Sequence, residues 1–177
     1  MLRLFVGIEL PAALRLRLSL LCNGVAGARW VDPGNLHLTL RFIGEVDEGM
    51  ASDIDAALAH IRAPGFAVTL AGTGCFGGER PRVLWIGIED SPPLLQLQER
   101  IEAALRRAGV PPDTRRYSPH VTLARLKQVD VARVQGFIAA NALFRAAPFA
   151  VERFSLIASY PTKSGAIYED QADYVLR

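Results

Sequence analysis

The chain is short of the residues that hold a small fold together covalently or through a metal. It has two cysteines and three histidines among 177 residues. Cys22 and Cys75 stand far apart, with no Cys-x-x-Cys pair and no Cys/His spacing that would indicate a zinc site or a redox pair. We therefore expect two buried thiols and a fold that depends on its apolar core, to which half of the residues can contribute.

The sequence also lacks any uninterrupted apolar run of about 18 residues. Its opening, Met1 to Glu9, has no apolar region of signal-peptide length, so we expect a cytoplasmic protein with no membrane segment. A net charge of +2 is too small for a nucleic-acid scaffold. Cations do gather near residue 120, as a solvated face or a site for an anionic ligand: Arg106, Arg107, Arg115, Arg116, Arg125 and Lys127.

One tetrapeptide, His-x-Thr-Leu, occurs twice. The copies are His37-Leu38-Thr39-Leu40 and His120-Val121-Thr122-Leu123, and they use two of the three histidines. From composition, the chance that two of three histidines have a threonine two residues later is on the order of one in a few hundred. The third, His60, lacks the threonine, and we interpret it as a surface or capping residue.

The residues around the motifs suggest an internal duplication. The second motif follows the first by 83 residues, and at the same offset Phe149-Ala150-Val151 matches Phe66-Ala67-Val68. Residue patterns predict helices over 12–21, 47–61, 92–108 and 130–140, and strands over 4–8, 35–43, 66–70, 83–88, 121–126, 149–158 and 166–176. We expect an α+β fold of two lobes related by a pseudo-twofold axis, each an antiparallel sheet with outer helices, around a central cleft.

The motif residues suit acid/base chemistry at phosphorus. In a strand, residues i and i+2 share a face, so each motif presents one imidazole and one hydroxyl. Near neutrality one histidine can act as base and the other as acid in an in-line displacement. Thr39 and Thr122 can donate hydrogen bonds to phosphate oxygens, and Arg41, four residues past His37, is expected on the same face.

Three further residues are candidates for substrate binding. Arg125 lies five residues past His120 and reaches the same face only if a bulge interrupts the strand. Phe42 and Tyr117 flank the motifs, and they either stack a base or belong to the core.

Other readings of the two histidines are weaker. A metal site normally recruits carboxylates or thiols, and neither motif has one at ligand spacing, so we expect no cofactor. A serine hydrolase lacks its Gly-x-Ser-x-Gly here. A non-catalytic module that binds RNA ends through the same residues stays open.

The chain resembles the 2H phosphoesterase superfamily, named for two His-x-Thr/Ser-x motifs, and within it the RNA 2',3'-cyclic phosphodiesterases, also called 2'-5' RNA ligases. The likeness covers nearly the whole of residues 1–177 as a single bilobal domain. It is carried by Arg3 to Pro11, Trp30, Asn35 to Val46, Pro81 to Gly87 and Pro119 to Arg125. One departure is Tyr117-Ser118-Pro119, where relatives often have a basic residue after the aromatic one.

The resemblance implies metal-independent hydrolysis of a terminal 2',3'-cyclic phosphate on RNA to a 2'-phosphomonoester. It implies His37 as proton donor, His120 as proton acceptor, and Thr39 and Thr122 at the phosphate. Ligation to an RNA 5'-hydroxyl is the reverse reaction. A phosphodiesterase of another small cyclic phosphate is the alternative function, and a monomer is the default expectation.

Overall fold

The computed structural model describes residues 1–177 as four α-helices and ten strands with one 3-10 turn. In chain order these are β1 (Leu2–Glu9), α1 (Ala12–Leu21), β2 (Arg29–Trp30), η1 (Pro33–Asn35), β3 (His37–Val46), α2 (Glu48–Ala59), β4 (Phe66–Val68), β5 (Leu70–Phe76), β6 (Val83–Ile88), α3 (Pro92–Arg107), β7 (His120–Arg125), α4 (Val131–Ala140), β8 (Phe149–Val151), β9 (Arg153–Thr162) and β10 (Gly165–Val175).

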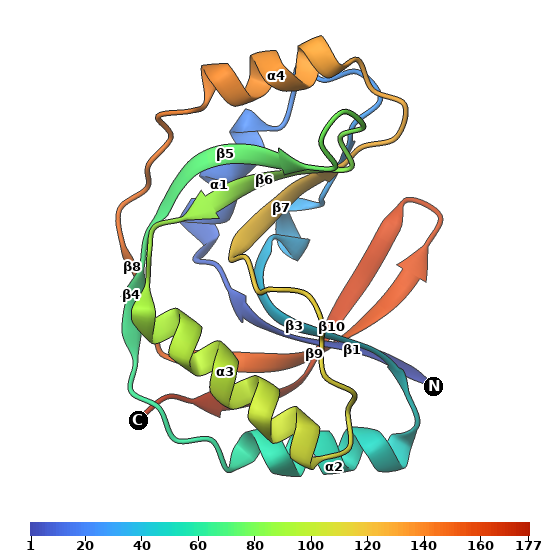
Figure 1. Cartoon of the computed structure of the whole chain (residues 1–177), viewed down its shortest axis with the longest axis vertical. Coiled ribbons are helices and arrows are strands. Elements are labelled where there is room, and N and C mark those ends of the chain that lie inside the picture. The colour runs from blue at the N-terminus through green and yellow to red at the C-terminus, as the bar shows by residue number, and fades with distance from the viewer.

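Eight of the strands form one antiparallel sheet in the order β10-β9-β1-β3-β7-β6-β5, with β2 paired to β7. Strands β3 and β7 are joined by a single pairing, Leu38 with Val121. The sheet is therefore narrow at this junction, and a lobe lies on either side of it. Helices α2 and α3 lie with the lobe of β1, β3, β9 and β10, and α1 and α4 lie with the lobe of β5 to β7 (Figure 1). The predicted α+β fold of two antiparallel lobes with helices is confirmed.

The pseudo-twofold axis can be located from the strand register. Leu38 and Val121 are 83 residues apart in sequence and pair with each other. Ala67 and Ala150, also 83 apart, pair in the small sheet of β4 and β8. In each of these antiparallel pairs, a residue of the first half pairs with the equivalent residue of the second half. A twofold axis that exchanges the halves must therefore pass through both pairs, as an internal duplication requires.

The duplicated halves exchange elements rather than forming one lobe each. Strand β5, from the first half, pairs with β6 of the second, and β9, from the second half, pairs with β1 of the first. Helix α3 likewise packs against α2 and β3. Each lobe is therefore built from both halves of the chain.

The predicted helices are present within a few residues, because their ends carry local signals. Asp47, Ser91 and Asp130 accept hydrogen bonds from backbone N–H groups in the first turns of α2, α3 and α4. Gly109, with φ +97°, follows the end of α3. Strands β5 and β2 were not predicted, and the expected strand over 149–158 is divided into β8 and β9.

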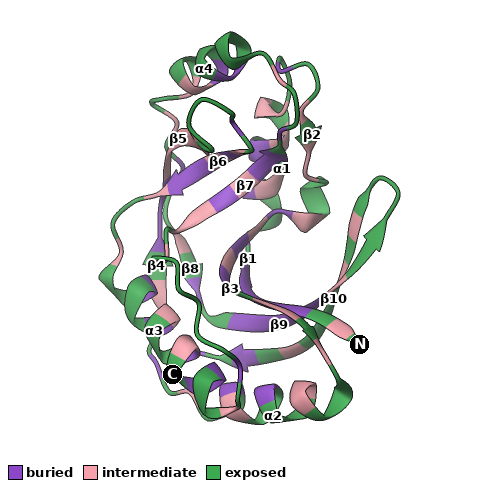
Figure 2. Cartoon of the chain, turned by 45° about the vertical axis from the view of Figure 1, so that its right-hand side comes forward, coloured by how far each residue is buried: buried purple, intermediate pink, exposed green.

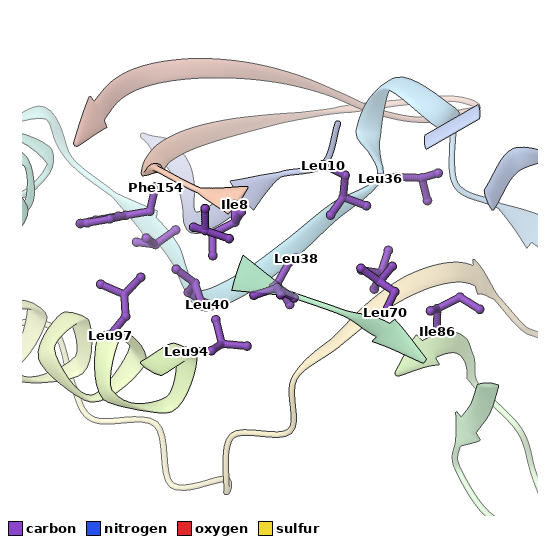
Figure 3. Close-up of a cluster of buried hydrophobic side chains, with 14 of the residues drawn as sticks. Ile8, Leu10, Leu36, Leu38, Leu40, Leu70, Ile86, Leu94, Leu97 and Phe154 are labelled. Carbon is purple, nitrogen blue, oxygen red and sulfur yellow. The ribbon is translucent and has the colours of Figure 1, made fainter. Parts of the chain in front are cut away.

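The core consists of 35 buried apolar residues on the inner faces of the sheet and helices. Figure 2 shows the buried positions along the central strands and the exposed ones on the outer helix faces. Leu36, Leu38 and Leu40 alternate into this core with exposures of 1% or less (Figure 3). Burial of these leucines fixes β3, and with it the polar residues on its other face.

The structure also bears on what the composition predicted for the cysteines and for a membrane segment. Cys22 and Cys75 are free thiols, half-buried rather than buried, and burial raises the pKa of Cys22 to about 11. No helix combines the length and apolarity needed to cross a membrane.

Candidate active site

The two motifs meet where β3 and β7 pair. Leu38 and Val121 are partners there, and both are fully buried on the core side. In sequence, each lies between the histidine and the threonine of its own motif. Because side chains alternate along a strand, that histidine and threonine point to the opposite face of the sheet. Antiparallel pairing sets a histidine of one strand opposite a threonine of the other: His37 opposite Thr122, and Thr39 opposite His120. All four side chains thus share one face across the pseudo-twofold axis.

Both imidazoles are held in the same way. Nδ1 of His37 lies 3.0 Å from the carbonyl oxygen of Asn35, and Nδ1 of His120 lies 2.7 Å from that of Ser118. A carbonyl oxygen only accepts, so in both rings Nδ1 carries the proton and donates it. The Nε2 atom of each ring is left for chemistry on a substrate. Asn35 is itself tied to β10, because its Nδ2 donates to the carbonyl of Ala166 at 2.7 Å.

Each histidine is flanked by a pair of aromatic rings. His37 contacts Phe5 and Tyr168, with ring centroids 6.2 and 5.7 Å away. His120 contacts Phe76 and Trp85, at 4.8 and 6.4 Å. Three of these contacts are edge-to-face and that of Trp85 is tilted, and such packing restricts rotation of the imidazoles.

The surroundings of His120 favour its neutral form. Burial lowers the pKa of His120 below the ordinary 6.5, and the positive charge of Arg125 lowers it further, while the hydrogen bond to Ser118 opposes both. A histidine that stays neutral at pH 7 is suited to accept a proton.

Two bulges decide which residues beyond the motifs reach the site. In β3 an extra residue, Leu40, lies between the partners of Val6 and Gly7 in β1, and in β7 the register shifts at the equivalent Leu123. A bulge reverses the alternation after it. Phe42 and Arg125 consequently lie on the face of the two His-x-Thr motifs, and β7 contains the bulge that Arg125 needs to reach this face.

The same bulge turns Arg41 away from the site, so its expected position on the face of His37 is wrong. Arg41 is 7% exposed. Its guanidinium donates to Glu102 at 2.6 Å, to the carbonyl of Pro111 at 2.6 Å and to that of Phe42 at 2.5 Å. With Nε, Nη1 and Nη2 all engaged, Arg41 clamps β3 to α3 and to the segment after it.

Tyr117 is half-buried and packs against the core. Its hydroxyl donates to the carbonyl of Thr39 at 2.9 Å, across the two motifs. Burial raises the pKa of Tyr117 above its ordinary value. Of the two readings of this residue, the core one fits, and its hydrogen bond positions the backbone of Thr39.

A groove of about 690 Å³ opens beside the site, on the side of His37. Thr39 and Phe42 belong to its lining, together with Phe5 and Tyr168, the two rings that contact His37. The β9–β10 hairpin, which projects from the body in Figure 1, forms one wall.

Three arginines line this groove, namely Arg3, Arg29 and Arg125, and the guanidinium of Arg3 stacks over the Phe42 ring at 5.3 Å. Of the six cations near the second motif, only Arg125 is among the lining residues.

The two motifs by themselves do not point to the four aromatic rings or to Arg3 and Arg29. Tyr168 and Phe76 carry no local signal, because their hairpins reach the site only through the long-range pairings of β9 with β1 and of β6 with β7. His60 ends α2, where its Nδ1 lies 2.7 Å from the carbonyl of Ala56, which fits the expected surface or capping role. No group of three or more His, Cys, Asp or Glu side chains is arranged to hold a metal.

Comparison with known proteins gives consistent matches. The family model described as the 2'-5' RNA ligase superfamily matches residues 14–161. The RNA 2',3'-cyclic phosphodiesterase of Aeropyrum pernix is 42% identical over 64% of this chain and 65% of its own length, a little under two thirds. Those of Archaeoglobus fulgidus and Escherichia coli are 30% and 37% identical, over 95% and 70% of this chain and 97% and 71% of theirs.

Two solved structures match over almost the full length. E. coli LigT complexed with 3'-AMP has a TM-score of 0.80 at 28% identity, covering 99% of this chain and 98% of that one. The protein TT0787 of Thermus thermophilus has a TM-score of 0.82 at 29% identity, with the same coverage.

Proposed function

The chain belongs to the 2'-5' RNA ligase superfamily, and on that premise we propose that it is an RNA 2',3'-cyclic 3'-phosphodiesterase that opens the cyclic phosphate at an RNA end to a 2'-phosphomonoester. The observation that carries the proposal is the pair of imidazoles on one face, each with Nδ1 held by a backbone carbonyl and Nε2 free. Relatives that bear the name RNA 2',3'-cyclic phosphodiesterase support the substrate class.

The reaction divides between the two histidines. Nε2 of His120 takes a proton from water as the water oxygen attacks phosphorus, and Nε2 of His37 gives a proton to the 3'-oxygen as the P–O3' bond breaks. The 2'-oxygen keeps its bond to phosphorus, so the product is a 2'-phosphate. Each proton transfer uses an imidazole, so the mechanism has no step that calls for a metal or cofactor.

The asymmetry of the site supports the assignment of His37 as acid and His120 as base. The leaving 3'-oxygen stays on the ribose, so the ribose and the RNA strand behind it must lie on the side of the acid. The groove that can hold that strand lies on the side of His37, through Phe5 and Tyr168. The lowered pKa of His120 independently favours its role as base.

The remaining polar groups serve the phosphate and the strand. The hydroxyls of Thr39 and Thr122 stand beside the imidazoles and donate to the non-bridging oxygens, where negative charge builds. Arg125 offsets that charge from the groove side, and Phe42 offers a half-exposed ring to a base. We assign no substrate contact to Arg41 or Tyr117.

The decisive experiment is turnover of an RNA oligonucleotide with a 2',3'-cyclic phosphate end, in excess EDTA, with the position of the product phosphate identified. We expect a 2'-phosphate. Alanine at His37 or at His120 should each lower turnover by about 10²- to 10⁴-fold. Alanine at His60 is the matched control and should leave turnover unchanged, since that histidine lies exposed at the end of α2.

Other outcomes point elsewhere. Preference for a small cyclic nucleotide over the oligonucleotide would indicate a different cyclic phosphate as substrate. Tight binding of the RNA end without turnover would indicate a binding module. Near-normal turnover of both alanine variants would refute the two-histidine mechanism. We propose that residues 1–177 act as one bilobal unit, monomeric and cytoplasmic, and sizing by gel filtration tests the monomer.

A further inference from the structure

The rings beside His120 orient that imidazole, but they also keep exposed surface that hydrolysis does not use. Beside His120, and outside the lining of the groove, Phe76 and Trp85 form a ledge of two rings with centroids 5.5 Å apart. Phe76 is 36% exposed, and Trp85 is half-buried. A water molecule that attacks from this side needs no aromatic surface. We propose that this ledge binds the base of a second RNA strand, whose 5'-hydroxyl replaces water in 2'-5' ligation; the inference rests on the function proposed above.

Strand register puts the ledge on the catalytic face. Trp85 pairs with Thr122 in β7, and Gly74 of β5 pairs with Trp85. Phe76, two residues past Gly74, shares the face of both. Rings therefore border both sides of the phosphate: Phe76 and Trp85 beside His120, where the nucleophile enters, and Phe5 and Tyr168 beside His37, where the leaving group departs.

Glycines leave room for the indole to lie flat along the sheet. A Cβ atom at Gly74 would lie 3.0 Å from Cε2 of Trp85 and closer still to Cζ2 and Cη2, and one at Gly87 would lie 3.3 Å from Cζ3. The indole Nε1 is buried and has no hydrogen-bond partner in the chain. The face of such a ring that is turned away from the sheet is a surface on which a planar base can stack.

Positive charge continues from the ledge. Arg80 and Arg82 are exposed in the β5–β6 connection, and neither takes part in an ion pair. The N–H of Arg82 donates to the carbonyl of Phe76 at 2.8 Å, which places these residues next to the ring. A stacking ring followed by free arginines is the arrangement that suits a single strand with its phosphates.

The chemistry is the hydrolytic step with one reactant exchanged. The 5'-oxygen of the second strand forms a bond to phosphorus while the P–O3' bond breaks. His120 takes the proton from the 5'-hydroxyl, and His37 gives one to the 3'-oxygen. The product is a 2'-5' phosphodiester with a free 3'-hydroxyl, and no other reactant is consumed.

The test is the ratio of ligation to hydrolysis in one reaction that contains a cyclic-phosphate donor and an excess of a 5'-hydroxyl oligonucleotide. Substitution Phe76→Ala should lower this ratio roughly 5- to 150-fold, the range expected from loss of one base stack. It should also raise the KM for the acceptor more than that for the donor. Phe76→Trp should restore the ratio. Tyr160→Ala, which removes a similarly exposed ring from a different strand, β9, should leave the ratio unchanged.

The contrary results are distinct. If Phe76→Ala lowers ligation and hydrolysis by the same factor, the rings only orient His120 and the proposal fails. It also fails if the wild-type protein hydrolyses the donor but forms no ligated product at saturating acceptor. Absence of hydrolysis itself would refute the proposed function rather than the ledge alone.

Discussion

Replacing Gly74 with alanine should damage both stability and catalysis, although Gly74 is neither catalytic nor in an unusual backbone conformation. Its φ lies outside the positive region, so alanine can adopt the same backbone. The added methyl group would overlap the indole of Trp85. That ring cannot settle further, because its other edge already lies near Gly87. The whole indole must therefore move.

The expected stability loss follows from overpacking. Forcing an extra methyl group into a packed site costs about 1 to 3 kcal/mol. For a chain of this size, each kcal/mol lowers Tm by about 2 to 4 °C, so the melting temperature should fall by roughly 2 to 12 °C. The displaced indole is the cross-strand partner of Thr122 and a neighbour of His120. A shift of about 1 Å there can lower kcat by up to about 100-fold.

Thermal unfolding followed by circular dichroism, together with kcat on the cyclic-ended oligonucleotide, measures both effects. Gly136→Ala is the matched control, because a Cβ at Gly136 in α4 meets nothing within 4 Å. That substitution should stabilise the protein by about 0.5 to 1 kcal/mol and leave kcat unchanged. A Gly74→Ala protein as stable and as active as the wild type would refute the role given to the indole.

Two further predictions concern charged residues. Glu102→Ala leaves the buried guanidinium of Arg41 without its carboxylate. We expect the free energy of unfolding, measured in urea, to fall by about 2 to 4 kcal/mol, which is below the usual maximum because Glu102 keeps 21% exposure. A loss under about 1 kcal/mol would contradict the role of Arg41 as a clamp. In the pH profile of kcat/KM, the acidic limb should lie below 6.5, since His120, the proposed base, becomes protonated only when pH falls through its lowered pKa. Arg125→Met removes one cause of that lowering and should move this limb to higher pH, whereas an unmoved limb would show that the Arg125 charge has no influence on His120.

The predictions from sequence succeeded where the signal was local and failed where it was not. The helix caps Asp47 and Asp130 lie within the segments that they begin, so the helices were found. Strand β5 was missed because Gly72 and Gly74 interrupt its pattern of apolar residues. Gly74 leaves room for the indole of Trp85, which belongs to another strand. Arg41 was misplaced because the bulge before it is set by pairing with β1, which periodicity does not report.

By itself the sequence determined the chemical groups of the site, since alternation along a strand places His37 with Thr39 and His120 with Thr122 on a face opposite their buried neighbours. Only the tertiary structure decided how the two pairs combine. Long-range pairing brought a histidine of one strand opposite a threonine of the other, exchanged β5 and β9 between the lobes, and put a groove beside His37 and an aromatic ledge beside His120. The physical reason is that a face is a property of one strand, whereas register, bulges and neighbours depend on strands distant in the chain.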